Sequence, residues 1–410
     1  MNKIYLIFLV LITFSSFIQS QTGWIQQTSG TSSQLRSVFF VNTSTGWVVG
    51  FDGTILNTVN GGTNWSPQTS GTTEHLFSVY FASVSAGWAV GSDNIVIKTT
   101  NAGMNWVQSG ILNGSGLPAV FFNNTLTGWV IGTNFAISDT VYKTTNGGTE
   151  WIAYDSGVTG AGLWSVYFVN TIIGWVSGDN GIIRNSTNGG INWLSQNSGT
   201  NNRLKSIFFT NSLTGWAVGD DGTIRVTANA GALWSGQTSN TIQQLSSVYF
   251  INSSSGWISG GSILGTTNGG INWIVQVANP TEHMNSINFT NSTTGWSVGG
   301  NGVILKTTNG GYTGIKLISN KIPKTFSLSQ NYPNPFNPTT VISFQLAVNS
   351  FAKINIYDIL GREITTLVNE MLQPGTYEVD WDAGNYPSGV YYYKLVAGDY
   401  SETRKMVLIK

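Results

Sequence analysis

The sequence predicts an all-β protein: a seven-bladed β-propeller in which an N-terminal strand closes the last blade, followed by a small C-terminal immunoglobulin-like β-sandwich. Three observations predict this fold. A Gly-Trp pattern recurs seven times at intervals of about 40 residues, short alternating segments lie between turn-forming residues, and the composition changes after Gly314. A period of about 40 residues with strand-like content is typical of propeller blades, each a four-stranded sheet.

The first 20 residues have the composition of a secretory signal peptide. One lysine precedes an apolar run from Ile4 to Ile12, and a more polar stretch with small residues follows. The run is well short of the roughly 20 residues that span a bilayer. We therefore expect cleavage after Ser20 and a mature chain that leaves the cytoplasm without an integral membrane segment.

The first repeat shows how one blade divides into four strands. The expected strands, from the innermost outward, are LRSVFFV (35–41), GWVVG (46–50), TILNTV (54–59) and NWSPQTSG (64–71). Side chains alternate along a strand, so Trp47 and Val49 share one sheet face while Val48 and Gly50 share the other. A bulky face against a small face lets neighbouring blades stack closely.

The heptapeptide TNGGINW, at 187–193 and 267–273, lies on the turn between the third and fourth strands of a blade. Asn tolerates unusual dihedral angles there, and Gly supplies positive φ. The turn resembles the Asp-box of sialidase-type propellers, with Asn in place of Asp. The Asn positions are Asn60, Asn101, Asn146, Asn188, Asn229, Asn268 and Asn309. We interpret the heptapeptide as architecture rather than as a catalytic motif.

A count of tryptophans predicts how the ring closes. In six repeats a Trp follows the turn Asn by five residues, but the seventh repeat has Gly314 at that position. The missing strand is present at the other end of the mature chain as GWIQQTSG (23–30), which contains Trp24. We expect this segment to be the outer strand of the last blade, which removes an exposed sheet edge.

The repeat spacing and the GW, NGG and W–SG patterns together resemble the photosystem II assembly and stability factor-like propellers. The resemblance covers about residues 22–314. It implies the fold and little about function, because one fold hosts many functions.

The C-terminal part is predicted to be a separate β-sandwich, since short alternating segments follow a Pro- and Asn-rich joint. We expect a linker at 315–326 and the sandwich at 327–410. Its motifs NYPNPFNP, YDILGRE and SGVYYYKL resemble type A sorting domains of type IX secretion. The residues that carry the match are Pro333, Asn334, Pro335, Phe336, Pro338, Gly361, Arg362, Gly389 and Tyr391. The resemblance implies the type IX machinery as a partner and export across an outer membrane; a carbohydrate-binding sandwich is the alternative.

The composition limits the kinds of catalytic site, metal site and partner that the chain can have. The 18 basic and 18 acidic residues balance, which argues against a nucleic-acid partner. The absence of cysteine excludes disulfides, cysteine nucleophiles and thiolate metal sites, and two histidines form no ligand-spaced cluster. The Asp residues of the hairpin turns are ordinary turn residues. We therefore expect no catalytic residue, no metal and no cofactor.

Comparison of the blades points to one face of the ring. The turns on one face nearly repeat, whereas the loops on the other face vary, and positions that contact a ligand are expected to differ from blade to blade. The candidate ligand-binding residues lie where the innermost strands begin on the variable face: Arg36, His75, Phe77, Trp164, Arg203, Lys205 and His283. The competing explanation is that solvent-facing positions drift freely.

The sequence favours a secreted or cell-surface binding module for a glycan or protein ligand. Aromatic rings, cationic donors and histidines suit an acidic glycan or a peptide carboxylate. Two alternatives remain open: an extracellular glycoside hydrolase of the sialidase or xyloglucanase type, which needs clustered acids on the variable face, and a structural or assembly factor of the envelope.

Overall fold

The computed structural model describes residues 23–134, 138–311, 315–384 and 386–410, in two compact units. One unit is Gly23–Thr313, and the other contains Gly314–Lys410. The predicted signal peptide at 1–20 lies outside the described residues. Among the described residues no helix is long and apolar enough to cross a membrane.

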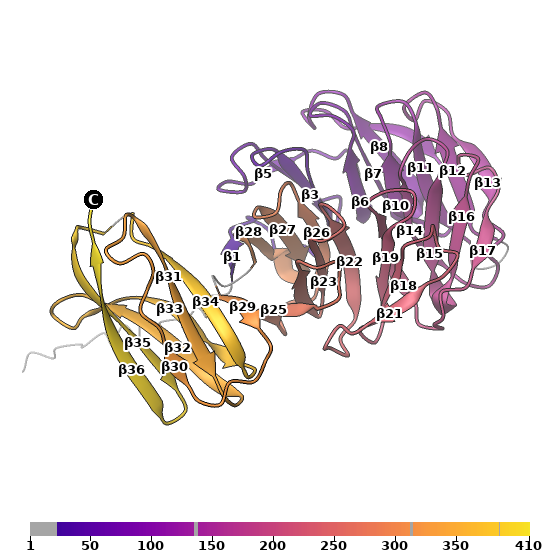
Figure 1. Ribbon diagram of the computed structural model, residues 1–410. Helices are drawn as coiled ribbons and strands as arrows, with labels where there is room; N and C mark the ends of the chain where they lie inside the picture. Colours follow the sequence, from indigo (N-terminus) through magenta and orange to yellow (C-terminus); the bar gives the residue numbers. More distant parts are fainter. Residues whose placement is uncertain (1–22, 135–137, 312–314, 385) are drawn as a thin grey trace, which may run out of the picture. The chain divides into compact units, whose positions relative to one another are not determined.

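The first unit contains seven four-stranded antiparallel sheets, which Figure 1 shows arranged around a ring. The innermost strands are β2 (Leu35–Phe40), β6 (Leu76–Phe81), β10 (Gly116–Phe122), β14 (Leu163–Phe168), β18 (Leu204–Phe209), β22 (Leu245–Phe250) and β26 (Met284–Phe289). The second strands are β3 (Gly46–Gly50), β7 (Gly87–Gly91), β11 (Gly128–Thr133), β15 (Gly174–Gly178), β19 (Gly215–Gly219), β23 (Gly256–Gly260) and β27 (Gly295–Gly299).

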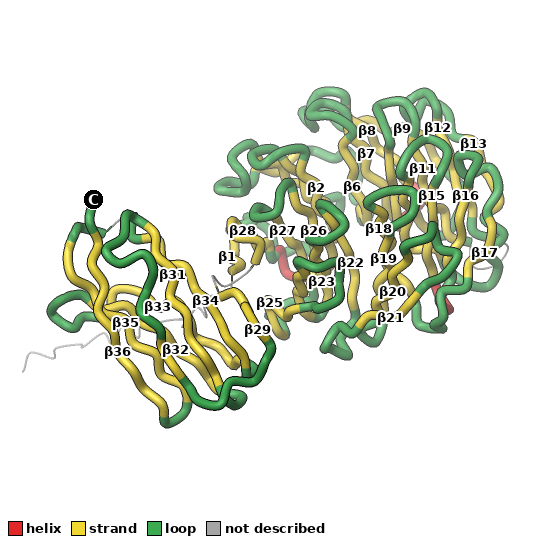
Figure 2. Tube along the Cα trace, in the orientation of Figure 1, coloured by secondary structure: helices red, strands yellow, loops and turns green. Residues whose placement is uncertain are grey.

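The outer half of each sheet follows the same order. The third strands are β4 (Ile55–Thr58), β8 (Ile95–Thr99), β12 (Thr140–Thr144), β16 (Ile183–Ser186), β20 (Ile224–Thr227), β24 (Ser262–Thr266) and β28 (Ile304–Gly311). The outer strands are β5 (Ser66–Gln68), β9 (Val107–Ile111), β13 (Ile152–Asp155), β17 (Leu194–Gln196), β21 (Ser235–Gln237), β25 (Ile274–Ala278) and β1 (Gly23–Gln27). Loops join the strand ends, and three single 3₁₀ turns, Ser92–Asn94, Asp179–Gly181 and Gly300–Gly302, lie between second and third strands (Figure 2).

The predicted closure of the ring is confirmed. β1 pairs antiparallel with β28, so strands from the two ends of the propeller lie side by side (Figure 1). Trp24 is 3% exposed, meets Phe289 edge to face at 5.7 Å, and donates its indole N–H to Gln276 Oε1 at 3.0 Å. The equivalent Trp65 meets Phe40 edge to face at 5.8 Å. The last blade therefore repeats the packing of the others.

Blade stacking follows from the alternation in the second strands. Trp47 lies parallel to Phe81 of the next blade, with ring centroids 3.5 Å apart. Val48 instead packs in a cluster with Trp296 of the preceding blade. The same Trp–Phe stacking recurs at each interface between blades, so every blade packs a large aromatic side chain against the next one.

The turn between the third and fourth strands is architecture, as its sequence predicts. Thr58 Oγ1 accepts a hydrogen bond from the Gly62 amide at 2.8 Å, and Asn60 Oδ1 accepts one from the Asn64 amide at 2.9 Å. The Gly61 carbonyl accepts the indole N–H of Trp296 at 3.2 Å. Gly62 has φ of +86°, which a residue with a side chain rarely adopts. The turn therefore links two blades.

The second unit is built from two four-stranded sheets. One has the order β29 (Ile315–Ser319), β34 (Gly375–Asp382), β31 (Thr339–Leu346), β30 (Ser327–Leu328), and the other β33 (Glu363–Leu372), β32 (Ser350–Tyr357), β35 (Gly389–Ala397), β36 (Tyr400–Leu408). Both sheets contribute to one core, which includes Phe344, Trp381 and Tyr393.

Residues 315–319, which the sequence analysis places in a linker, are a strand of this second unit. β29 pairs with β34, with Ile315 opposite Val379 and Leu317 opposite Tyr377. Ile315 also packs against the sandwich core. The segment forms backbone hydrogen bonds with β34 and apolar contacts with the core, and these interactions explain why it is a strand rather than a linker.

Candidate functional site

The seven candidate residues lie where the innermost strands begin. Arg36, Phe77, Trp164 and Lys205 are the second residues of β2, β6, β14 and β18, and His75, Arg203 and His283 immediately precede β6, β18 and β26. Each of these strands has a register irregularity after its first residue, as in β2 between Leu35 and Ser37. The irregularity leaves the second residue out of the regular pairing at the strand entrance.

Arg36 has the most unusual environment of the seven. Its guanidinium lies 5.8 Å from the ring centroid of Phe77 in the next blade. Its Nε is buried, and no hydrogen bond or ion pair reaches it within the part of the chain that the structure describes. Burial lowers the pKa of Arg36 below its ordinary value. A buried cationic donor without a protein partner is costly, and it is satisfied when an anion binds.

Lys205 and His283 share the electrostatic environment of Arg36. Burial lowers the pKa of Lys205, the positive charges of Arg36 and Arg203 lower it further, and Asp220 opposes them. Burial also lowers the pKa of His283, with further contributions from Lys205 and Arg36. Residues from three different blades therefore interact through space, as expected where innermost strands converge on the ring axis.

Two neutral side chains orient these groups. Lys205 Nζ donates to Gln244 Oε1 at 3.0 Å, and His283 Nε2 lies 2.7 Å from Ser246 Oγ. Neither contact neutralises a charge. We call Arg36, Lys205 and His283 the axial cluster.

Arg203 and Trp164 form the edge of the same site, but Arg203 is already paired. Its Nε lies 2.7 Å from Asp179 Oδ1 and 3.9 Å from Asp220 Oδ2, and its guanidinium lies 5.4 Å from the Trp164 ring centroid. The Trp164 indole N–H donates to Asp179 Oδ1 at 2.8 Å. Because Asp179 satisfies both side chains, Arg203 is less available to a ligand than Arg36.

His75 does not join this group. Its ring stacks on Phe51, with centroids 4.0 Å apart, and its Nδ1 accepts the Asp52 amide at 3.1 Å. His75 thus packs on the hairpin turn of the preceding blade. The same position in the last blade holds His283, which instead meets Ser246, so equivalent positions in the repeat have different partners.

Sequence reasoning missed the acidic side chains of the site. A hollow of about 590 Å³ beside Arg203 is lined by Asp179, Asn180, Asn202, Asp220, Asp221 and Gln244. Burial, the largest single effect, raises the pKa of Asp179, but hydrogen bonds from Trp164 and the Gly162 amide and the charge of Arg203 outweigh it and lower that pKa. Asp179 is therefore ionised at neutral pH. The Asp-Asp pair at 220–221 is the sequence feature that could have indicated the hollow.

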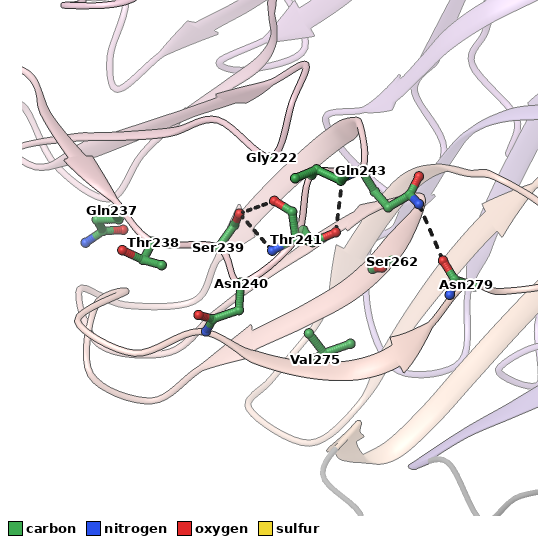
Figure 3. Close-up of a pocket in the computed structure, with 11 residues that line it drawn as sticks. Gly222, Gln237, Thr238, Ser239, Asn240, Thr241, Gln243, Ser262, Val275 and Asn279 are labelled. Carbon is green, nitrogen blue, oxygen red and sulfur yellow. Dashed lines mark hydrogen bonds between the residues drawn. The ribbon is translucent and has the colours of Figure 1, made fainter. Parts of the chain in front are cut away.

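A second hollow, of about 670 Å³, lies between the loop after β21 and strand β25. Figure 3 shows its uncharged lining, in which Gln243 Nε2 reaches Asn279 Oδ1 at 3.5 Å and the Gln243 amide donates to Thr241 Oγ1 at 3.0 Å. Ile242 in this loop is 87% exposed. None of the seven candidate residues lines this hollow, and no charged side chain is among its lining residues.

Two residues of the predicted C-terminal motif, Asn334 and Phe336, hold the start of the second unit's sandwich against its last strand, β36. The Phe336 amide donates to the Val407 carbonyl at 3.0 Å, Asn334 Oδ1 accepts the Val407 amide at 3.0 Å, and the Phe336 ring is 2% exposed. Arg362 Nε bonds Asp358 Oδ2 at 2.7 Å within its turn. These contacts give the motif a role in the fold of the domain.

Comparison with known families agrees with this architecture. The family model described as "Photosynthesis system II assembly factor YCF48" matches residues 17–163 and 226–332. The chain belongs to the YCF48 family. A second model, "Secretion system C-terminal sorting domain", matches residues 330–410. This YCF48-family propeller thus carries a type IX sorting domain, which implies export to the cell surface or beyond.

Solved structures support the fold. YCF48 from Cyanidioschyzon merolae is 22% identical, with a TM-score of 0.58 over 69% of this chain and 98% of that one. YCF48 bound to D1 peptide is 21% identical, with a TM-score of 0.58 over 71% and 98%. PorZ, a surface component of the type IX secretion system of Porphyromonas gingivalis, is 12% identical, with a TM-score of 0.54 over 94% and 60%. The search of curated proteins gave no match.

Proposed function

We propose that this chain is a non-enzymatic binding propeller, delivered by type IX secretion, whose axial cluster binds a carboxylate or sulfate group of an extracellular ligand. The observation that carries the proposal is the buried Nε of Arg36, which has no partner in the described part of the chain. An anionic ligand supplies the hydrogen-bond acceptor that Arg36 lacks.

The surroundings of Arg36 support an anion rather than a neutral ligand. Lys205 adds a second cation whose polar contact is the uncharged Gln244. Phe77 and Trp164 offer aromatic faces beside the two arginines. A relative of the same family has been solved with a bound peptide, which supports a peptide as one form of the ligand.

Glycoside hydrolysis is the second candidate, because Asp179 and Asp220 both lie within 4 Å of Arg203 Nε. Such hydrolases pair one ionised carboxylate with one carboxylic acid that stays protonated until it protonates the leaving group. The lowered pKa of Asp179, to which the charge of Arg203 contributes, does not suit the acid. The arrangement favours binding over hydrolysis.

An array experiment tests both functions. The mature chain is applied to peptides with free carboxyl ends and to sulfated and carboxylated glycans, and the same glycans are assayed for cleavage. We expect binding without cleavage, and we expect Arg36→Gln and Lys205→Gln each to weaken the binding of anionic ligands by roughly 10-fold or more. Arg184→Gln is the matched control, because Arg184 also carries a positive charge but bonds the Gly157 carbonyl at 2.7 Å. Equal loss in the control, or cleavage that depends on Asp179, would overturn the proposal.

A further inference from the structure

The innermost strands carry a ring of aromatic side chains around the axis, three residues further along each strand than the level of Arg36. Successive ring centroids are 4.6, 5.0, 5.0, 4.7 and 5.1 Å apart. We call these residues the aromatic collar: Phe39, Tyr80, Phe121, Tyr167, Phe208 and Tyr249. Asn288 takes the equivalent place in the last blade and accepts the Phe40 amide through Oδ1 at 3.0 Å.

Phenylalanine and tyrosine alternate in the collar, so every second blade contributes a phenol. Burial raises the pKa of Tyr80, Tyr167 and Tyr249. Tyr249 raises the pKa of Tyr80 further, and both Tyr80 and Tyr249 raise that of Tyr167. The rings of Tyr80 and Tyr167 both contact Phe121, and those of Tyr167 and Tyr249 both contact Phe208, so the phenols lie near one another although their blades are not adjacent. They remain protonated at physiological pH.

Among the described residues, none makes a hydrogen bond with the hydroxyl of Tyr80, Tyr167 or Tyr249. All three side chains are only partly buried, and Tyr167 and Phe208 line a hollow of about 440 Å³ that extends to the turns after β18 and β22. Within the described residues, three O–H donors on alternate blades thus have no protein acceptor.

A ring of serine hydroxyls on the same strands adds donors. Each serine oxygen accepts a backbone N–H of the next blade, as Ser37 Oγ does from Val79 at 3.2 Å, so its own hydrogen is free to donate. The other members of this ring are Ser78, Ser165, Ser206, Ser247 and Ser286. The walls between the axial cluster and the collar therefore present many donors.

Charge along the axis also favours an anion. Arg36 and Lys205 make no ion pair within 4 Å in the described part of the chain. No carboxylate is among the groups that shift the pKa of the three collar tyrosines. Phenol donors that keep their protons at physiological pH, on strands adjacent to those of two cations that make no ion pair in the described part of the chain, are suited to a small anion.

We propose that the aromatic collar binds a monovalent anion of the size of chloride or bromide on the ring axis, held by the hydroxyls of Tyr80, Tyr167 and Tyr249. The anion connects innermost strands of three alternate blades. It binds the folded ring and not the unfolded chain, so it stabilises the propeller in proportion to its occupancy.

The alternation supplies a mild variant for the test. Tyr80→Phe, Tyr167→Phe and Tyr249→Phe remove the three donors and leave rings that the collar already accepts at Phe39 and Phe121. Thermal unfolding is measured in sodium chloride and in sodium gluconate of equal ionic strength, because gluconate is a much larger monovalent anion than chloride. We expect chloride to raise the midpoint of the wild-type protein by a few degrees in a saturable manner, and to have no such effect on the triple variant.

A bromide soak locates the ion directly. Anomalous diffraction from wild-type crystals should show one bromide on the axis among the three hydroxyls, and this measurement needs no variant to fold. A water at that place, or an equal response of the wild-type and triple-variant proteins to chloride, overturns the proposal. Because the axial cluster is unchanged in the triple variant, ligand binding at the mouth should persist, which separates this proposal from the proposed function.

Discussion

Replacement of Trp24 by alanine tests whether the N-terminal strand closes the ring. Trp24 is 3% exposed and packs with Phe289 and Trp257, so its truncation leaves a cavity in the interface between the last two blades. Large-to-small changes of this kind cost about 3–5 kcal/mol. The variant also loses the indole N–H that donates to Gln276 Oε1, and Gln276 is only 8% exposed. We therefore expect a loss of stability in the upper part of that range.

Urea unfolding of the mature chain, followed by near-ultraviolet circular dichroism, measures this cost. Trp65→Ala removes the equivalent residue of the first blade, which is 9% exposed, and should cost about as much as Trp24→Ala. Ile25→Ala is the matched control in the same strand, because Ile25 is 60% exposed and its truncation should change the stability by less than about 0.5 kcal/mol. If Trp24→Ala behaves like Ile25→Ala, the N-terminal strand is not part of the ring.

Three further predictions concern the buried histidine, the repeated turn and export. Because the pKa of His283 is lowered in the folded protein, the unfolded chain binds more protons than the folded one below about pH 6.5. The stability should therefore fall as the pH drops from 7.5 to 5.5, and it should fall less in His283→Gln. Equal pH profiles of the two proteins would contradict this. Thr58→Val removes the acceptor of the Gly62 amide and should lower the stability by about 1–3 kcal/mol. Thr58→Ser should be nearly neutral, because Ser186 makes the same contact with Gly190 at 2.8 Å. An equal loss of stability in both variants would show that the hydroxyl is not responsible. Removal of residues 315–410 should leave a folded propeller in the periplasm, because the propeller has its own cores and the sorting domain is a separate unit. If proteinase added to intact cells still digests the truncated protein, the sorting role is contradicted.

Much of the fold could be predicted because its determinants are local and repeated. The spacing of Trp47 and its six equivalents sets the blade, and the absence of a Trp at position 314 indicates the strand that contains Trp24. The strand at 315–319 was missed because its partner, β34, lies about 60 residues later in the chain. An isolated alternating segment does not reveal whether it will find an edge to pair with.

The candidate site was only partly predictable, because its partnerships join different blades. The pairing of Arg203 with Asp179 spans 24 residues and two blades, and Asp179 alone looks like an ordinary turn residue. The different partners of His75 and His283 depend on what each blade places beside them, Phe51 in one case and Ser246 in the other. The alternation of Phe and Tyr in the collar is visible in the sequence, but only the ring brings the phenols together.

The measurement that tests the binding claim most directly uses one ligand in charged and neutral forms. A free-acid ligand selected on the array and its amide or methyl ester are titrated into the wild-type, Arg36→Gln and Arg184→Gln proteins by calorimetry. A hydrogen bond to a charged group contributes about 1.5–3 kcal/mol, so the wild-type protein and the Arg184→Gln control should prefer the free acid by roughly 10- to 100-fold. The account predicts that Arg36→Gln loses this preference and binds both forms equally. An Arg36→Gln protein that still prefers the free acid would contradict the assignment of the axial cluster as the anion site.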